Sequence, residues 1–155
     1  MTVIDLSEQI DDICTRYPKF WLSEEAQREL QALWGGADCN DSGVFERDET
    51  IRINLDGTNW YGELRIAVAP NGWHAVSISY WYGQGGGGSS PSVWNRFAYT
   101  TREEAVAAGL SELITKFESL RDCKSYVPTN QSDLAQRMIE TLKGYLSQTR
   151  QLTLF

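Results

Sequence analysis

Residues 51–82 have the sequence IRINLDGTNWYGELRIAVAPNGWHAVSISYWY, and the pattern of this stretch decides the fold. Ile51, Ile53 and Leu55 alternate with polar residues, which is the period of a half-buried β-strand. Asp56 and Gly57 then form a strong turn signal. The stretch therefore predicts that a strand ends and the chain reverses just after residue 55.

Two further alternating segments follow at residues 64–68 and 73–82, separated by the turn signal of residues 70–72. A fourth strand is expected at residues 93–99. Short turns join strands that are antiparallel neighbours. The sequence therefore predicts a four-stranded antiparallel meander. Between its third and fourth strands, the glycine run at residues 85–88 is expected to form a mobile tip.

Helical patterns lie before the strands. Apolar residues recur at steps of three or four along residues 3–16, and Pro18 ends that pattern. Ser23 is a candidate N-cap for a second helix, which Gly35 and Gly36 stop. A polar, acidic loop is expected at residues 37–49.

Two more helices are expected after the strands. Thr101 and Glu104 have the spacing of a capping box, and the helix they begin extends to about residue 120. A last helix is expected at residues 132–147. The predicted fold is thus α+β, with two N-terminal and two C-terminal helices on the sheet. Residues 1–147 form the single domain, and residues 148–155 form a C-terminal tail.

Length and composition are those of one folded domain. The 155 residues include 41% hydrophobic residues and six tryptophans, and no apolar run is long enough to cross a membrane. The N-terminus lacks the pattern of a secretory signal. Cys14, Cys39 and Cys123 are odd in number and widely spaced, which favours reduced thiols in the cytoplasm over disulfides or a zinc site.

The net charge of −7 is unevenly distributed. Residues 1–50 carry twelve acidic and four basic side chains, a net charge of −8, while the remainder carries +1. Such a surface repels phosphates, so tight direct DNA binding is not expected. One interpretation is a nucleic-acid mimic whose surface includes Asp11, Asp12, Glu24 and Glu25. The other is that these carboxylates lie on the solvent faces of two amphipathic helices.

No residue pattern identifies an active site. The glycine run lacks the Lys-Ser/Thr of a phosphate-binding loop. His74 is the only histidine and lies in a predicted strand, where a structural role is expected. The cysteines and this histidine have no metal-ligand spacing. The sequence therefore favours a non-enzymatic protein with no cofactor and no metal.

Aromatic residues concentrate in the predicted sheet. On an open face they would be able to stack single-stranded bases, but few arginines lie nearby. We expect most of them to be covered instead. Trp73 and Trp81, on one predicted face, form a candidate patch for a protein partner.

The end of the chain is rich in apolar residues, whereas a terminus is usually polar. The last five residues are Gln151, Leu152, Thr153, Leu154 and Phe155. This pentapeptide resembles the motif with which bacterial replication and repair proteins bind the DNA polymerase sliding clamp, Gln-Leu-(Ser or Asp)-Leu-Phe. Thr153 keeps the hydroxyl of serine at the third position. The resemblance covers five of the 155 residues.

The resemblance implies an adaptor or regulator that binds the sliding clamp through residues 151–155, with Leu154 and Phe155 as apolar anchors. The globular domain would then bind a second protein, which the sequence does not identify. Alternatively, the apolar residues of the tail pack back on the domain as a latch.

The other hypothesis is an acidic inhibitor of restriction or CRISPR systems, encoded by a phage or another mobile element. The segment at residues 72–120 resembles small phage and plasmid domains, without a diagnostic motif.

Overall fold

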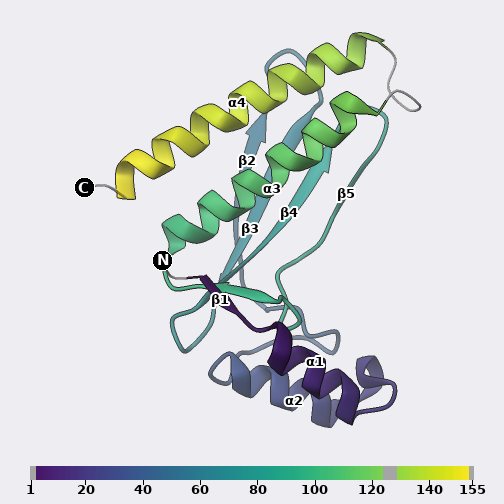
Figure 1. Ribbon diagram of the computed structural model, residues 1–155, viewed down its shortest axis with the longest axis vertical. Helices are drawn as coiled ribbons and strands as arrows, with labels where there is room; N and C mark the ends of the chain where they lie inside the picture. The colour runs from purple at the N-terminus through teal and green to yellow at the C-terminus, as the bar shows by residue number, and fades with distance from the viewer. Residues whose placement is uncertain (1–2, 124–128, 154–155) are drawn as a thin grey trace.

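The computed structural model describes residues 3–123 and 129–153 (Figure 1). Within these ranges the protein has one six-stranded antiparallel sheet, four α-helices and a short 3-10 helix. The strands are β1 (Val3–Asp5), β2 (Glu49–Asn54), β3 (Tyr61–Val68), β4 (His74–Trp81), β5 (Gly86–Gly88) and β6 (Phe97–Tyr99). The helices are α1 (Ser7–Arg16), η1 (Phe20–Leu22), α2 (Glu24–Leu33), α3 (Arg102–Asp122) and α4 (Thr129–Thr153).

The sheet confirms the α+β class and corrects the number of strands. Its order is β1-β6-β4-β3-β2, with β5 paired to β4. The expected meander is present as β2, β3 and β4, with Ile51 opposite Leu64 and Leu64 opposite Ile78. The prediction of four strands was wrong because β1 lies inside the expected first helix and β5 inside the glycine run. Both are three-residue strands, too short to show an alternating pattern.

The glycine run pairs with the sheet, where a mobile tip was expected. Gly86 lies opposite Trp81, and Gly88 lies opposite Ser79. A Cβ atom on Gly86 would collide with the carbonyl oxygen of Tyr80, and one on Gly88 would collide with the Ser79 hydroxyl. The glycines are therefore needed for the close approach of β5 to β4.

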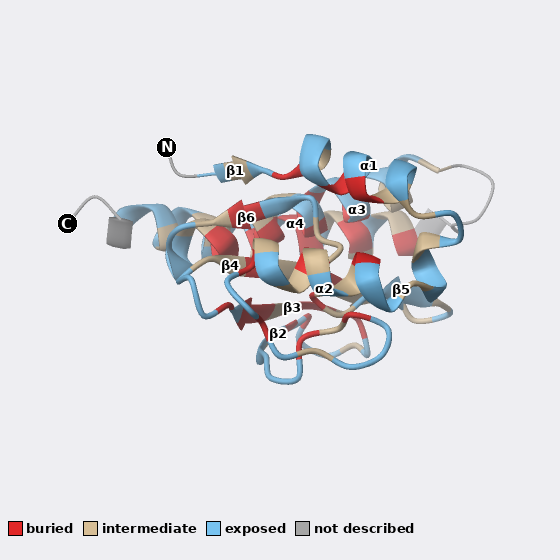
Figure 2. Ribbon diagram, turned by 90° about the horizontal axis from the view of Figure 1, so that it is seen from below, coloured by how far each residue is buried: buried red, intermediate tan, exposed pale blue. Residues whose placement is uncertain are grey.

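α3 and α4 pack against each other and cover one face of the sheet (Figure 1). Leu64 and Ile78 from the strands meet Leu113 and Phe117 of α3 and Met138 of α4 in the first of two cores. The Thr101 hydroxyl accepts a hydrogen bond from the Glu104 amide at 3.2 Å, so α3 begins at the predicted cap. Figure 2 shows buried residues concentrated where these helices meet the strands.

α1 and α2 lie at one end of the sheet and enclose the second core (Figure 1). Trp34, at the end of α2, is fully buried and donates from Nε1 to the Val93 carbonyl at 3.1 Å. The Ser23 hydroxyl accepts from the Ala26 amide at 3.1 Å, which confirms the predicted cap of α2. Ala67 and Ala75 bring β3 and β4 into the same core.

The last helix is longer than the sequence predicted. α4 runs through Thr153, six residues beyond the expected end at residue 147. Among the described residues Leu142 is the last buried side chain, and residues 143–151 are exposed or half-buried. The predicted tail therefore overlaps the helix, and its described side chains, at residues 148–151, lie outside both cores.

Candidate functional site

The first residues of the C-terminal pentapeptide lie in the last turn of α4. The Gln151 side chain is exposed, and the backbone of Leu152 and Thr153 is helical. Leu154 and Phe155 lie outside the described residues, as do the side chains of Leu152 and Thr153. The last turn of a helix opens more readily than its middle. The pentapeptide thus starts in that last turn, nine residues after the buried Leu142.

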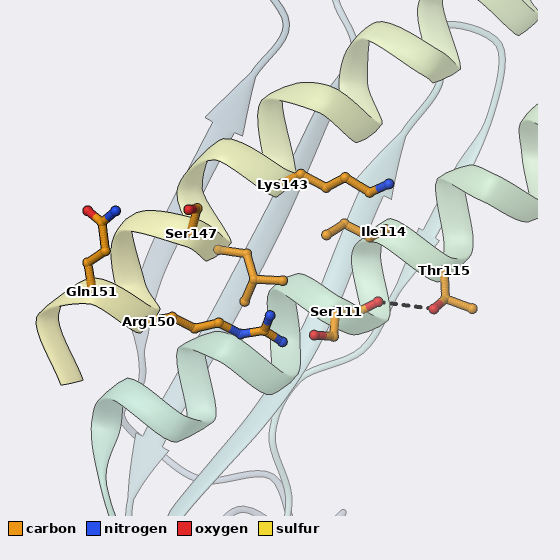
Figure 3. A pocket seen from close by; sticks show the side chains of 8 residues that line it. Ser111, Ile114, Thr115, Lys143, Ser147, Arg150 and Gln151 are labelled. Carbon is orange, nitrogen blue, oxygen red and sulfur yellow. Dashed lines mark hydrogen bonds between the residues drawn. The ribbon is translucent and has the colours of Figure 1, made fainter. Parts of the chain in front are cut away.

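A groove of about 560 Å³ lies between α3 and α4, directly before the pentapeptide (Figure 3). Ile114 and the half-buried Leu146 supply its apolar surface. Both residues also belong to the first core or pack against it, so the floor of the groove is fixed. The lining residues are Ser111, Ile114, Thr115, Lys143, Leu146, Ser147, Arg150 and Gln151.

The groove carries positive charge. Lys143 and Arg150 extend from α4 across the gap between the helices, while Gln151 points away from α3 (Figure 3). Among the described lining residues, none has a carboxylate. The Thr115 hydroxyl donates to the Ser111 carbonyl at 3.1 Å, so it is already engaged. An apolar floor beside the Lys143 ammonium suits a ligand with both apolar and acidic groups.

The four acidic residues of the proposed mimic surface all have partners. Asp11 pairs with Arg96 at 2.8 Å, Asp12 with Arg16 at 2.9 Å, and Glu24 with Arg28 at 3.9 Å. The Glu25 carboxylate accepts from the Ser23 hydroxyl at 3.3 Å. These contacts within the chain offset part of the negative potential of α1 and of the start of α2.

Trp73 and Trp81 do not form one patch. Trp73 packs edge-on against Trp34, with ring centroids 5.9 Å apart, and packs against the second core. Trp81 lies at the far end of β4, eight residues away, which is roughly 26 Å along a strand. Trp81 lines a surface pocket of about 390 Å³.

That pocket adjoins a polar cluster that the sequence analysis did not identify. The Glu63 side chain is 10% exposed and accepts from Arg52 at 2.8 Å, and its other oxygen lies 3.8 Å from Arg65 Nε. Arg65 also donates to the Ser90 hydroxyl at 2.7 Å. The Arg52 guanidinium stacks 4.1 Å from the Tyr61 ring centroid. The strand alternation placed these residues on one face, but only the register shows that they meet.

A second feature without a sequence signal is the pair Trp21 and Leu22, which are 62% and 74% exposed. They belong to η1, between α1 and α2. Lys19 precedes them with φ +53°, the only non-glycine residue with positive φ among those described. Exposed tryptophans of this kind often anchor protein interfaces.

The described residues hold no group of three or more histidine, cysteine or acidic side chains positioned for a metal. His74 is half-buried, and its Nδ1 has no hydrogen-bond partner. Burial raises the pKa of the Cys39 thiol. A raised pKa lowers the thiolate fraction, whereas nucleophilic catalysis needs a larger one. None of the described helices is both long and apolar enough to cross a membrane.

The described surfaces with features that suit a function include the α3–α4 groove, the Arg52–Glu63–Arg65 cluster and the exposed Trp21. No protein-family model, curated protein or solved structure matches this chain.

Proposed function

We propose that this protein is a non-enzymatic adaptor or regulator that docks on the bacterial DNA sliding clamp through residues 151–155. The observation that carries the proposal is the C-terminal pentapeptide, Gln151 to Phe155, which departs from the clamp-binding pattern only at Thr153. Its start at the exposed Gln151, nine residues beyond Leu142, the last buried side chain among the described residues, supports the proposal because a partner reaches Gln151 without disturbing either core.

Docking involves a change of conformation at the end of α4. A short peptide that fills pockets on a partner binds in an extended form, whereas residues 151–153 are helical in the free protein. Unwinding the last turn breaks a few backbone hydrogen bonds in a segment where water replaces them. Binding therefore selects an open helix end, and its cost is subtracted from the affinity.

The expected affinity follows from the size of the anchors. Burial of Leu154 and Phe155 contributes roughly 1.5–3 kcal/mol each, and the exposed Gln151 amide both donates and accepts at the rim. The conformational entropy lost when the peptide becomes ordered offsets part of this binding free energy. The dissociation constant is therefore expected roughly in the micromolar range. A ligand of this strength competes with other clamp ligands for one site and alters access to the clamp without chemistry.

The test is surface plasmon resonance of an immobilised bacterial sliding clamp with the intact protein and with a form truncated after Arg150. We expect micromolar binding that is lost on truncation. The double variant Leu154→Ala, Phe155→Ala should behave like the truncation. The matched control is Tyr145→Ala, which removes a 47% exposed aromatic side chain from the same helix.

Two results would contradict the proposal. One is no binding by the intact protein, and the other is equal binding by the truncated form. In the first case, a lower melting temperature of the truncated form would identify the pentapeptide as a latch that packs on the domain.

A further inference from the structure

We propose that the α3–α4 groove is a second contact surface for the same partner, and that it receives an acidic segment with an apolar side chain next to the partner's peptide-binding pocket. This inference rests on the proposed function. It assigns a role to Lys143, Ile114 and Leu146, which lie outside the pentapeptide.

The first argument is that no linker separates the groove from the pentapeptide. Lys143 and Gln151 are eight residues apart on one helix, an axial distance of about 12 Å. Opening the last turn, at residues 151–153, leaves Leu146 packed against the first core, with Lys143 three residues before it on the same helix. A globular partner that holds the pentapeptide therefore approaches to within a few side chains of the groove.

The second argument is charge. Residues 1–50 carry a net charge of −8 and the remainder of the chain carries +1, so the acidic excess lies outside α3 and α4. The groove between these helices is lined by Lys143 and Arg150, with no carboxylate among its described lining residues. No ion pair involves Lys143 within the described part of the chain. Lys143 thus has its charge available for a partner's carboxylate.

The third argument distinguishes a protein segment from nucleic acid. Two cations neutralise few phosphates, and tight binding to a nucleic-acid backbone needs several more. The floor made by Ile114 and Leu146 offers nothing to a phosphate but buries an aliphatic or aromatic side chain. An acidic peptide segment with one apolar residue uses both parts of the groove.

The experiment compares three ligands on an immobilised sliding clamp: the intact protein, a synthetic peptide of residues 148–155, and the variant Lys143→Glu. We expect the intact protein to bind about tenfold more tightly than the peptide at low salt, and the variant to lose most of that difference. Lys143→Gln should give an intermediate loss. The matched control is Arg28→Glu, a charge reversal on α2 at a side chain that is 75% exposed.

A linker insertion tests the short spacing directly. A Gly-Ser linker of about ten residues between Ser147 and Gln148 keeps the pentapeptide but frees it from the groove. Because effective concentration falls as a flexible linker lengthens, the affinity of this form should drop toward that of the peptide. Circular dichroism and thermal unfolding show whether each variant keeps the fold.

The outcomes separate the two proposals. If the peptide binds and Lys143→Glu, folded as the parent, binds as tightly as the parent, the groove has no role and the clamp-binding function stands. If neither intact protein nor peptide binds, the proposed function fails and this inference fails with it. A tenfold loss in Lys143→Glu without loss in Arg28→Glu supports the groove as part of the interface.

Discussion

Single side chains set where the helices begin, and Ser23 is the clearest case. Its hydroxyl accepts from the Ala26 amide and satisfies one of the free donors at the start of α2. We expect Ser23→Ala to lower the free energy of unfolding by about 0.5–2 kcal/mol in urea denaturation. Ser119→Ala is the control, since that hydroxyl donates to the Thr115 carbonyl within α3 and alanine favours helix. Equal effects of the two substitutions would show that the cap is unimportant.

Two single glycines also matter, and their replacement by alanine should have opposite effects on the fold. Gly86→Ala places a methyl group against the Tyr80 carbonyl, so we expect β5 to detach and the paired amides of β4 and β5 to exchange hydrogen faster. Gly144→Ala meets no atom within 4 Å in α4 and should stabilise the protein by up to about 1 kcal/mol. Unchanged exchange in Gly86→Ala would contradict the β4–β5 pairing.

Between elements, an ion pair connects the edge strand β2 to the start of α3. Arg102 donates to both carboxylate oxygens of Glu49, at 2.8 and 2.5 Å, and these hydrogen bonds lower the pKa of Glu49. Because the pKa is lower in the folded state, the pair stabilises the fold above the ordinary pKa of a glutamate, about 4.3. That stabilisation is lost as the pH falls below this value. Since both side chains are 47% exposed, it amounts to at most about 1 kcal/mol.

The prediction is that Glu49→Gln lowers the melting temperature slightly at pH 7 and removes part of the fall in melting temperature between roughly pH 5 and pH 3. Scanning calorimetry at several pH values measures both effects. Glu8→Gln is the control, because Glu8 lies in α1 and makes no ion pair within the described residues. A variant as acid-sensitive as the parent would show that the pair does not couple β2 to α3.

Elements with a clear period or cap could be predicted from the sequence. The alternation around Ile51 and the caps Ser23 and Thr101 all correspond to observed boundaries. β1 could not be predicted, because Val3–Asp5 pairs with Phe97–Tyr99, nearly a hundred residues away. The local sequence pattern does not indicate a partner so distant in the chain. The end of α4 was missed because its last turns have polar residues where a buried face would have marked the helix.

The candidate site was predictable only in part. The pentapeptide can be recognised directly in the amino-acid sequence. The groove cannot, because it depends on α3 and α4 lying antiparallel, so that Ile114 and Leu146 line the same gap. Trp73 and Trp81 were paired on the basis of strand alternation alone. Trp73 packs against Trp34 at the second core, whereas Trp81 lies at the other end of β4. Which aromatic residues remain exposed is decided by tertiary packing that a single sequence does not specify.

For the whole molecule, the two cores share their strands. Leu64 and Ile66 of β3 belong to the first core, and Ala67 of the same strand belongs to the second. Loss of either core therefore exposes residues that support the other, and the protein should unfold in one step.

We expect Trp34→Phe to lower the stability of both cores together by at least about 1–3 kcal/mol, since it leaves the buried Val93 carbonyl without its donor. Far-ultraviolet circular dichroism and tryptophan fluorescence should report one common midpoint in urea. Trp21→Phe, at a 62% exposed side chain, should leave the midpoint unchanged. Separate midpoints would mean that α1 and α2 unfold independently.

Because the second core includes residues of β4 and β6, it is completed only after those strands have been synthesised. α1 and α2 leave the ribosome first, but the core into which their apolar faces pack also includes Ala75, Val93 and Ala98. At roughly 5–20 residues per second, the nascent chain waits several seconds between the end of α2 and the arrival of those residues. During that interval the core that buries Leu6, Ile10 and Trp34 in the finished protein is incomplete. Residues 1–50 carry a net charge of −8, and like charge of this size opposes association between such segments.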